Sequence, residues 1–510
     1  MLSGRVGKKL FNFRLIAALA AAMTAGILFG AVAAYFAIGW PYLLIPFALA
    51  SAALLICALK FKNTSLTVCF ILIIAAFMLG AFSAYLFLAS FAANEIPACQ
   101  TVLVEGRVEK VGITSGGRTY LVISSARADG KSLGGKVIAY LTENAGDYCE
   151  KGYTVKFYAA LTKQNAFEGG EISYYAQNSI KYSCNVYGGL EARWGFSLFG
   201  SANAAIRNTL FDNLDGETAS VCYAMLTGDT SFISEGTLAS FRGGGIAHLF
   251  AVSGLHIGAI FGALTLLFKR LPVNRYISAA IRVAAILLYA GVCNFTPSSI
   301  RATVMCAVML CASLLHKKND TLNSLSLAAL ILLIINPMYL FGAGFLLSFG
   351  AVLGIIMLGH NLEYILRALP KRVREPLSVG LAVHVSTVPT QLACFGYVSW
   401  AGLLLNLLII PIITVLYLLL FFATVLAMII PPAAGALVGV ASSPIQLLVN
   451  AAVEGGLESA VISLPAKLWI YPPFALLIAG VSDKFNFKPV LRSALCSLAL
   501  IGLTIVFLVS

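Results

Sequence analysis

The chain has 510 residues, of which 60% are hydrophobic and only 11% are charged. Soluble globular proteins carry about a quarter charged residues, so this composition excludes a soluble chain and indicates a polytopic membrane protein. The formal net charge of +13 does not by itself indicate a nucleic-acid surface, because most basic residues lie in short loops between apolar runs. In such loops, basic residues indicate the cytoplasmic side of the membrane. These loop clusters are Lys60 with Lys62; Lys269, Arg270 and Arg275; Lys317 with Lys318; the LRALPKRVREP segment; and Lys484, Lys488 and Arg492.

The amino-terminal region, residues 1–93, is expected to form three spanning helices, over 15–39, 42–59 and 66–91. Each run is near the ~20 residues that a helix needs to cross a bilayer. Basic residues precede the first run, which is longer than the apolar core of a cleavable signal peptide. We therefore expect a cytoplasmic amino terminus, with the third helix leaving the membrane on the outer face.

Residues 94–187 differ in composition, with alternating segments such as TVLVEGRVEKV and YTVKFYAALTK separated by glycine-rich turns. The pattern predicts a small extracytoplasmic β-barrel of about five strands, and an OB-like fold is the natural candidate. Such barrels often bind oligonucleotides by stacking bases on aromatic rings, for which Tyr120, Tyr153 and Tyr158 are candidates. The alternative is that these tyrosines pack in the barrel core, because ten Arg and Lys against nine Asp and Glu make the stretch nearly neutral.

The eleven cysteines include no CxxC pair and no zinc-type spacing, so we expect neither a metal site nor a cofactor. Most of them lie inside apolar runs. In an outward-facing β domain a disulfide is expected, and Cys149 with Cys184 is the favoured pair, although the sequence does not fix the connectivity.

Residues 188–245 connect the β domain to the second set of apolar runs. The stretch 190–214 has moderate apolar periodicity with scattered charges, which predicts an interfacial or lid helix. The mixed stretch after it contains Asp229, for which we weigh two partners, Arg242 and His256.

The stretch from Phe241 to Gly258, FRGGGIAHLFAVSGLHIG, has the most unusual polar content for a membrane segment. Three consecutive glycines, Gly243 to Gly245, predict a helix break, with a new helix N-terminus directly after it at Ile246. On that helix Ser253 and His256 share a face, and His248 lies about 80° around the axis. Ionisable groups at such depth require a protein-lined or wet environment, which makes the stretch a candidate site. The alternative is structural: packed histidines, and small-residue helix contacts at Ser253 and Gly254.

Residues 246–510 are expected to form one polytopic domain. Alternating its apolar runs across the membrane, starting from an outward β domain, places every basic loop in the cytoplasm and the carboxyl end outside. The ten expected runs are 246–268, 276–294, 300–315, 321–337, 342–359, 376–395, 401–430, 433–453, 466–481 and 490–509. With the first three, they give about 13 spanning or part-spanning helices.

Two of these runs carry polar residues at membrane depth. Arg301 lies one residue inside an apolar run, where an arginine normally faces an interior cavity or a partner. Thr387 and Gln391 flank Pro389, which should kink its helix and free a carbonyl. For Thr387 and Gln391 the alternative to a path-lining role is hydrogen bonding between helices.

The ordered motifs resemble the ComEC family of competence proteins. They are TGDTSFI, FRGGGIAHLFAVSGLHIG, FTPSSIRATVM, NPMYLFGAGFLLSFGAVLG and TVPTQLACFGYVSWAGLLLNLLIIP, which together cover roughly residues 220–415. The resemblance implies a channel in the bacterial plasma membrane that takes up single-stranded DNA during natural transformation. It also implies an extracytoplasmic OB-like domain at the position of the predicted β domain.

One departure from the family concerns its carboxyl-terminal metallo-β-lactamase-like domain. This chain ends at Ser510 after a predicted spanning helix, and its five histidines form no HxHxDH-type cluster. It also contains no GxxxxGK[ST] motif for nucleotide hydrolysis. We therefore expect a separate nuclease, a cytoplasmic ATP-driven motor and a DNA receptor as partners, beside the lipid bilayer, and leave a homo-oligomer open.

The sequence thus predicts a channel rather than an enzyme, with no catalytic residue. The expected translocation path comprises Asp229, Arg242, Gly243, Gly244, Gly245, His248, Ser253, Gly254, His256, Arg301 and Gln391. A few cations and a helix N-terminus suit a moving polyanion better than a strongly basic surface, which would hold it too tightly.

Two alternatives remain open. The first is a transporter for another anionic or lipid-linked substrate. The second is an intramembrane hydrolase with Ser253 as nucleophile, His256 or His248 as base and Asp229 as orienter. Against the hydrolase, AVSGLHI is not a GxSxG elbow, and a Ser and a His three residues apart on a helix point side by side.

Overall fold

The computed structural model describes residues 15–38, 64–92, 101–114, 118–141, 151–169, 171–186, 189–193, 195, 197–399, 401–455, 461–463, 470–481, 495–499 and 502–503. Its contacts divide the chain into two compact units. The first is Met1–Ser201 with Lys318–Gly342, and the second is Ala202–Lys317 with Ala343–Ser510. Lys318–Gly342, inside the stretch expected to form one polytopic domain, thus belongs with the amino-terminal helices and the β domain.

In the first unit, helices α2 (Leu15–Tyr35) and α4 (Thr64–Ala92) pack closely through glycines. A Cβ added to Gly26 would lie 2.0 Å from the Phe77 carbonyl oxygen, and one added to Gly80 would lie 2.3 Å from that of Met23. Small residues let backbones approach in a bilayer, where the hydrophobic effect does not drive helices together. Helix α12 (Thr321–Ile335) packs against α2 and leads into the 3-10 helix η4 (Pro337–Phe341).

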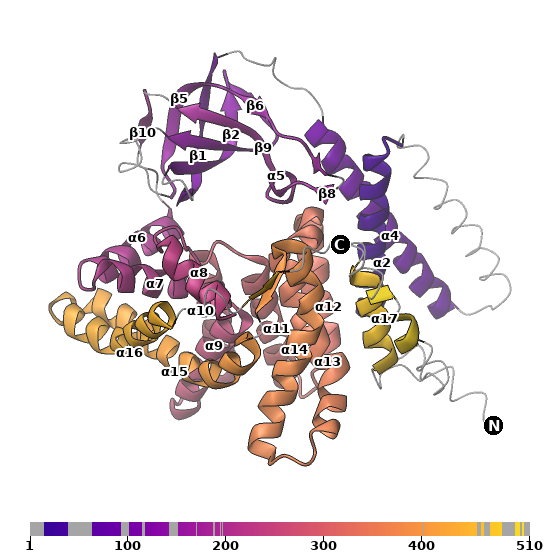
Figure 1. The fold of residues 1–510 in the computed structure, drawn as a ribbon. Helices are drawn as coiled ribbons and strands as arrows, with labels where there is room; N and C mark the ends of the chain where they lie inside the picture. The colour runs from indigo at the N-terminus through magenta and orange to yellow at the C-terminus, as the bar shows by residue number, and fades with distance from the viewer. Residues whose placement is uncertain are drawn as a thin grey trace. The chain divides into compact units, whose positions relative to one another are not determined.

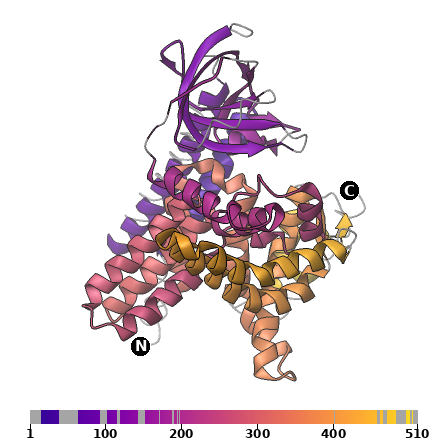
Figure 2. The same ribbon diagram turned by 90° about the vertical axis from the view of Figure 1, so that its left-hand side faces the viewer.

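The β domain of the first unit is an eight-stranded sheet that curves around a common interior (Figure 2). Its order is β10-β5-β1-β2-β4-β9-β6, with β3 attached to β2. The β4–β9 pair is parallel and every other pair in this sheet is antiparallel. The strands are β1 (Thr101–Ile113), β2 (Thr119–Ala128), β3 (Lys131–Ser132), β4 (Lys136–Leu141), β5 (Thr154–Ala160), β6 (Thr162–Lys163), β9 (Ile180–Val186) and β10 (Glu191–Arg193). A short hairpin, β7 (Phe167–Glu168) with β8 (Glu171–Ile172), and helix α5 (Tyr174–Gln177) precede β9.

Alternation along the strands decides which side chains lie on the buried face of the sheet. In β5, Val155, Phe157 and Ala159 are buried, while Thr154, Tyr158 and Ala160 are exposed. Successive side chains of a strand point to opposite faces, so the inward set forms the core and the outward set meets solvent. A small sheet is therefore present where the sequence predicted one, while the bounds of the domain and its OB-like barrel stay predictions.

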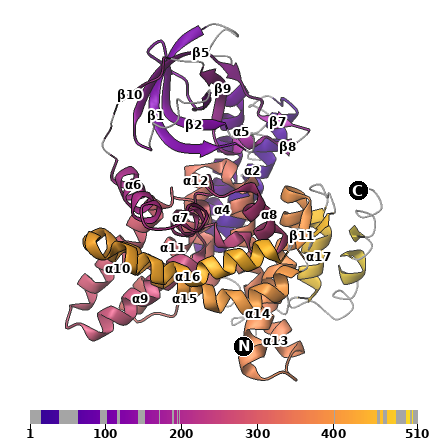
Figure 3. The same ribbon diagram turned by 60° about the vertical axis from the view of Figure 1, so that its left-hand side comes forward.

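The second unit is helical. Figures 1 and 3 show α13 and α14 running side by side as a hairpin, and α15 pairs with α16 in the same way. Its helices are α6 (Leu198–Phe211, which begins in the first unit), α7 (Gly216–Thr227), α8 (Glu235–Gly243), η3 (Ala247–Leu249), α9 (Gly254–Arg270), α10 (Arg275–Val292), α11 (Pro297–Leu314), α13 (Ala343–Ile365), α14 (Lys371–Phe395), α15 (Ala401–Ile429), η5 (Pro431–Ala433), α16 (Ala434–Glu454) and α17 (Tyr471–Val481). Two short strands, β11 (Tyr397–Ser399) and β12 (Val461–Ser463), pair antiparallel.

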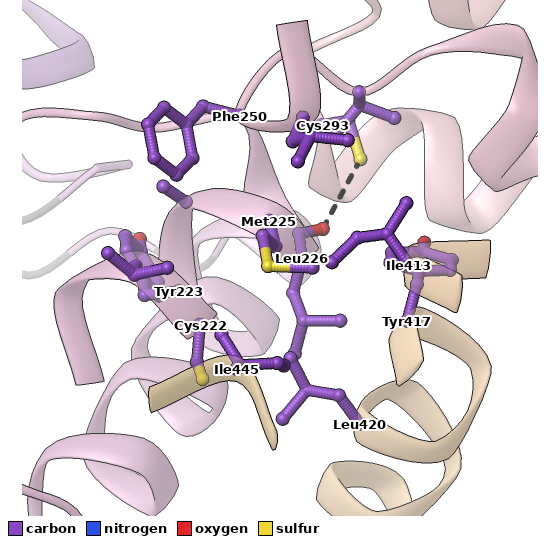
Figure 4. Close-up of a cluster of buried hydrophobic side chains, with 14 of the residues drawn as sticks. Cys222, Tyr223, Met225, Leu226, Phe250, Cys293, Ile413, Tyr417, Leu420 and Ile445 are labelled. Atoms are coloured by element: carbon purple, nitrogen blue, oxygen red, sulfur yellow. Dashed lines mark hydrogen bonds between the residues drawn. The ribbon is translucent and has the colours of Figure 1, made fainter. Parts of the chain in front are cut away.

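The core of the second unit forms around α7, in which every residue from Thr218 to Thr227 is buried. Figure 4 shows Cys222, Met225 and Leu226 of α7 among side chains of α15 and α16, together with Phe250 and Cys293. A helix that is buried on every side lies in the interior of its unit, with other elements packed around it. The stretch that follows the predicted lid helix is therefore a central element of the fold.

Eight helices within the described ranges are long and apolar enough to cross a membrane. They include α2, α4, α10, α11, α13, α14, α15 and α16 or parts of them, and each lies at a predicted run. The run predicted over 42–59 and part of 490–509 lie outside the described residues. Helices α12, with 15 residues, and α9, with 17, also lie at predicted runs but are too short to count among these eight.

Candidate functional site

The glycine-rich break lies between α8 and α9, and it is longer than predicted. Helix α8 ends at Gly243, Gly245 takes a left-handed backbone with φ +68°, and η3 covers only three residues before α9 begins at Gly254. The break is confirmed, but the expected helix start at Ile246 is wrong by eight residues. Ser253 caps the helix with its side chain and therefore fixes its start there.

His248 consequently does not share a helix with Ser253 and His256. It lies in η3 with an exposed side chain, and its Nδ1 is 3.3 Å from the carbonyl oxygen of Gly245. The predicted angle of about 80° between His248 and the other two residues assumed one continuous helix, and is wrong for that reason.

The break is held against the start of α15 by backbone contacts that only glycine allows. A Cβ on Gly245 would lie 2.6 Å from the Cα of Gly402. The Ser399 hydroxyl donates to the Gly243 carbonyl at 2.6 Å and accepts the Gly402 N–H at 3.1 Å. A third contact comes from the side chain of Asn406, whose Nδ2 donates to the Gly245 carbonyl at 3.5 Å. The two predicted motifs at 241–258 and 387–411 are therefore joined here.

Ser253 and His256 form a capping box at the N-terminus of α9. The Ser253 Oγ accepts the Leu255 N–H at 3.2 Å, and the Ser253 N–H donates to His256 Nδ1 at 3.3 Å. A backbone N–H can only donate, so Nδ1 must accept, and the proton of the neutral imidazole lies on Nε2. The His256 side chain is 1% exposed, and its Nε2 has no hydrogen-bond partner among the described residues.

The imidazole of His256 stacks on the ring of Tyr417 in α15, with centroids 4.1 Å apart. The Tyr417 hydroxyl donates to the Tyr289 hydroxyl, and Tyr289 donates in turn to the Leu226 carbonyl at 2.7 Å. The same carbonyl lies 3.8 Å from Cys293 Sγ, the contact dashed in Figure 4. This buried chain links the capping histidine to the end of α7, so His256 is packed as the structural alternative expected.

Arg301 of α11 lies beside the first residue of α9. Its Nη2 would be 2.7 Å from a Cβ on Gly254, and its side chain is 8% exposed. Nε donates to Ser348 Oγ in α13 at 2.8 Å, and Nη1 lies 3.8 Å from Met305 Sδ. Among the described residues no carboxylate pairs with Arg301. A buried cation and the positive end of a helix dipole are thus adjacent, and all of the guanidinium's protein partners are neutral.

The N-terminus of α11 also holds the approach to α9. The Ser298 hydroxyl donates to the Val252 carbonyl at 2.6 Å, one residue before the cap of α9. Ser298 and Arg301 belong to the predicted motif FTPSSIRATVM, and Ser348 belongs to LLSFG. The structure therefore joins three predicted motifs around the start of one helix.

Three other predicted path residues have separate surroundings. Arg242 is exposed on the last turn of α8. The Asp229 carboxylate accepts from Ser231, at 3.1 Å from its N–H and 2.6 Å from its hydroxyl, rather than from Arg242 or His256. Gln391 donates to Thr387 Oγ1 on its own helix at 3.0 Å, so its hydrogen bond is within α14 rather than between helices. Their assignment to a path stays a prediction.

Ser253, His256 and Asp229 do not have the arrangement of a hydrolase triad. The Ser253 hydroxyl oxygen accepts a backbone N–H, and the ring nitrogen nearest to Ser253 binds its N–H rather than its hydroxyl. Asp229 is engaged by Ser231. A nucleophilic serine needs its hydroxyl hydrogen-bonded to a base, and no His ring nitrogen within the described residues accepts from Ser253 Oγ.

The three candidate tyrosines of the β domain have different surroundings. Tyr158 is 66% exposed on the outer face of β5, whereas Tyr153 packs against the hydrophobic core of the β domain. The Tyr120 ring lies beside Gly112 of β1. Its centroid is 6.3 Å from that of the Tyr140 ring and 6.0 Å from Lys110 Nζ. Core packing therefore accounts for Tyr153, and Tyr158 is exposed. Tyr120 is half-buried against a second cluster formed by Val122, Ile138 and Ile180.

Of the two cysteines in the predicted disulfide, the structure describes one. Cys149 lies outside the described residues, and Cys184 is buried in the hydrophobic cluster of the sheet, with its Sγ 3.8 Å from the Ile138 carbonyl oxygen. Burial raises the pKa of a Cys184 thiol to about 12, which makes it a poor nucleophile at neutral pH. The pairing of Cys149 with Cys184 stays a prediction.

Sequence reasoning missed Arg282 and the two tyrosines behind His256. Arg282 stands inside the run 276–294, and an arginine within an apolar run was a sufficient signal to find it. Tyr289 and Tyr417 gave no such signal, because tyrosines are common in apolar runs and only packing brings these two together.

A family model described as "Competence protein" matches residues 225–482, which is just over half of the chain and contains every predicted path residue. The chain belongs to the competence protein family. The family predicted from the ordered motifs is therefore confirmed. With eight long apolar helices in the described part of the chain, this competence family member is a multi-pass membrane protein.

Three relatives are similar to part of the chain. ComE operon protein 3 of Bacillus subtilis (strain 168) is 27% identical over 201 residues, covering 39% of this chain and 25% of that protein. Recombination protein 2 of Haemophilus influenzae is 25% identical over 207 residues, covering 37% of this chain and 26% of that protein. An uncharacterized protein of Aquifex aeolicus is 28% identical over 170 residues, covering 33% of this chain and 38% of its own length.

The matched region thus spans about a quarter of the length of the Bacillus and Haemophilus proteins. No solved structure matches this competence family member.

Proposed function

We propose that this protein is a plasma-membrane channel that carries single-stranded DNA into the cytoplasm during natural transformation. The observation that carries the proposal is Arg301, a buried guanidinium with neutral protein partners at the N-terminus of α9. Membership of the competence protein family supplies the class of process.

The chemistry of this site favours an anion. An unpaired cation in a spanning segment costs at least several kcal/mol, about 2.5–3.5 on insertion scales, and is retained where it has a function. The N-terminus of α9 adds the partial positive charge of the helix dipole, which also favours an anion such as a phosphate. Ser348 and Met305 orient the guanidinium without neutralising it, and no carboxylate of the described residues pairs with it, so a passing phosphodiester would supply a counter-ion.

A moving strand needs contacts that are weak enough to release it. One guanidinium and one helix end provide such a contact, whereas a dense basic surface would trap a polyanion. The remaining predicted path residues, Asp229, Arg242, His248 and Gln391, would then border the route rather than bind each phosphate. Direction would come from a cytoplasmic motor.

We further propose that the β domain is an OB-like barrel that binds the strand before it enters the membrane. In support, β1, β2 and β4 form an antiparallel meander, β4 pairs parallel with β9, and β5 pairs with β1. These pairings fit a five-stranded Greek-key barrel of the OB type. The exposed Tyr158 and the half-buried Tyr120 offer rings for base stacking. This proposal places the amino terminus in the cytoplasm and the β domain and carboxyl end outside.

The test is uptake of labelled double-stranded DNA into a nuclease-protected cytoplasmic pool. It compares wild type, a deletion strain, and the deletion strain carrying Arg301→Gln, Arg301→Lys or Arg372→Gln. Arg372 is an exposed residue at the start of α14 and serves as the matched control. We expect the deletion to lose the protected pool while keeping surface-bound DNA, Arg301→Gln to reduce uptake roughly tenfold or more, and Arg301→Lys to retain more than Arg301→Gln.

Two results would overturn the proposal. Normal uptake in the deletion strain would exclude the channel and favour transport of another anionic or lipid-linked substrate. Equal uptake by Arg301→Gln and Arg372→Gln would exclude Arg301 as a contact on the path. Membrane levels of each variant, measured in parallel, separate loss of function from loss of protein.

A further inference from the structure

We propose that Arg282 of α10 is a second cationic contact for the phosphodiester backbone, farther along α9 than Arg301. The inference rests on the proposed function, since it assigns a further binding residue to the same path. It concerns a residue that no motif in the sequence singled out.

Arg282 lies on the side of α10 that faces the protein. Ser278, Ile286 and Tyr289, which are one or two turns away on the same face, are all buried. The neighbouring Ile281 and Leu287, on other faces, are 45% and 47% exposed. A charged residue on the inward face of a spanning helix marks a functional site more often than a structural one.

The partners of Arg282 are neutral. Its Nε donates to the Ser278 carbonyl at 3.1 Å, and its Nη1 donates to Thr265 Oγ1 of α9 at 3.1 Å. The guanidinium carbon lies 5.6 Å from the centroid of the Phe261 ring. Among the described residues no Asp or Glu forms an ion pair with it. The positive charge is therefore held in place but left uncompensated.

Arg301 has the same kind of surroundings. It too donates to one hydroxyl, that of Ser348, and lies over one phenylalanine ring, that of Phe349 at 5.9 Å. Two arginines in two adjacent spanning helices thus share a pattern of hydroxyl, aromatic ring and no carboxylate. Such a pattern keeps a guanidinium oriented while leaving its charge to an anion from outside the protein.

Both arginines lie against α9, at different points along its axis. Arg301 contacts the helix at Gly254, and Arg282 contacts it at Thr265, eleven residues later. At about 1.5 Å per residue this separation is roughly 16 Å along the helix. The two cations are therefore placed in sequence along one helix, as two successive contacts for an extended polyanion.

The experiment measures the rate at which labelled DNA enters the protected pool in strains carrying Arg282→Gln, Arg282→Lys, Thr265→Val or Arg275→Gln. Arg275 is exposed at the start of the same helix and receives the same substitution as a control. We expect Arg282→Gln to slow uptake roughly tenfold and Arg282→Lys to retain most of it. Thr265→Val keeps the charge and loses only the hydroxyl that orients it, so it should retain clearly more uptake than Arg282→Gln. Arg275→Gln should remain near wild type.

The Thr265→Val variant shows whether Arg282 contacts the DNA or only links α9 to α10. It removes the hydrogen bond between α9 and α10 while leaving the charge, so an uptake loss equal to that of Arg282→Gln would show a structural role and overturn the proposal. Wild-type uptake in Arg282→Gln would also overturn it. If wild type itself shows no more uptake than the deletion strain, the proposed function fails rather than this inference.

A second measurement covers the case in which Arg282→Gln does not accumulate. A photo-crosslinking amino acid at position 265, with Arg282 intact, is activated while labelled DNA is being taken up. Crosslinks to the DNA strand support the contact. Crosslinks to phospholipid without DNA would show that the guanidinium binds lipid headgroup phosphate instead, and would overturn the proposal.

Discussion

Gly245 and Gly402 meet backbone to backbone, so closely that a Cβ on Gly245 would lie 2.6 Å from the Cα of Gly402. These two residues join the glycine-rich break to the first turn of α15. Because Gly245 also has φ +68°, two independent constraints exclude a larger residue there.

We therefore expect Gly245→Ala to destabilise the protein, through both the strained backbone and the displacement of α15. The control is Gly258→Ala, because Gly258 lies in α9 with no atom within 4 Å of an added Cβ. The midpoint of thermal unfolding in detergent should fall for Gly245→Ala and stay unchanged or rise slightly for Gly258→Ala. Equal midpoints would show that the contact at Gly402 is not tight.

The hydrogen-bond chain from Tyr417 through Tyr289 to Leu226 predicts an order of stability. Tyr289→Phe leaves the buried Tyr417 hydroxyl without its acceptor, and it leaves the Leu226 carbonyl with the weaker Cys293 thiol as a donor. Tyr417→Phe removes only a donor to a hydroxyl that keeps its own acceptor. An unsatisfied buried group costs about 1–3 kcal/mol, so Tyr289→Phe should be the less stable variant.

The two variants are compared by thermal unfolding, with Tyr276→Phe as the control at an exposed tyrosine of the same helix. The reverse order, or no difference from Tyr276→Phe, would contradict the hydrogen-bond chain.

The capping box predicts what Ser253→Ala does. Loss of an N-cap side chain costs about 0.5–2 kcal/mol, so the variant should be somewhat less stable but should keep most DNA uptake. A hydrolase with Ser253 as its nucleophile would lose its activity completely. Complete loss of function in a variant that still accumulates in the membrane would therefore revive the hydrolase alternative.

The positions of Tyr158 and Tyr153 in the β domain predict that their substitutions have different effects, one on DNA binding and the other on stability. Tyr158→Ala should weaken binding of a single-stranded oligonucleotide to the full chain, because stacking on one base contributes about 1–3 kcal/mol, while leaving stability unchanged. Tyr153→Ala should lower stability, since its ring packs against the hydrophobic core of the β domain. Binding is measured by fluorescence anisotropy at several salt concentrations.

A salt-dependent affinity that is equal in wild type and Tyr158→Ala would place the contact elsewhere on the domain, with Tyr120 as the next candidate. Absence of binding even at low salt would count against DNA as the cargo.

Local patterns in the sequence were enough to predict several features of the fold. Apolar run length identified α2, α4 and most later spans, and period-two alternation located the β domain, because burial in a bilayer or a sheet follows spacing along the chain. Three adjacent glycines predicted the break before α9. The ordered motifs predicted the family.

Other features depend on contacts between residues far apart in the chain. Arg301 meets Ser348, 47 residues away, and Ser399 binds Gly243, 156 residues away. Helix α9 begins at Gly254 rather than at the predicted Ile246, because Ser253 and His256 cap it there. Tyr417 stacks on that histidine. Helical periodicity describes one helix at a time, so it can place an arginine in a membrane span but cannot identify its partners. Packing alone brought Arg282 and Arg301 to the same helix, each without a carboxylate among the described residues.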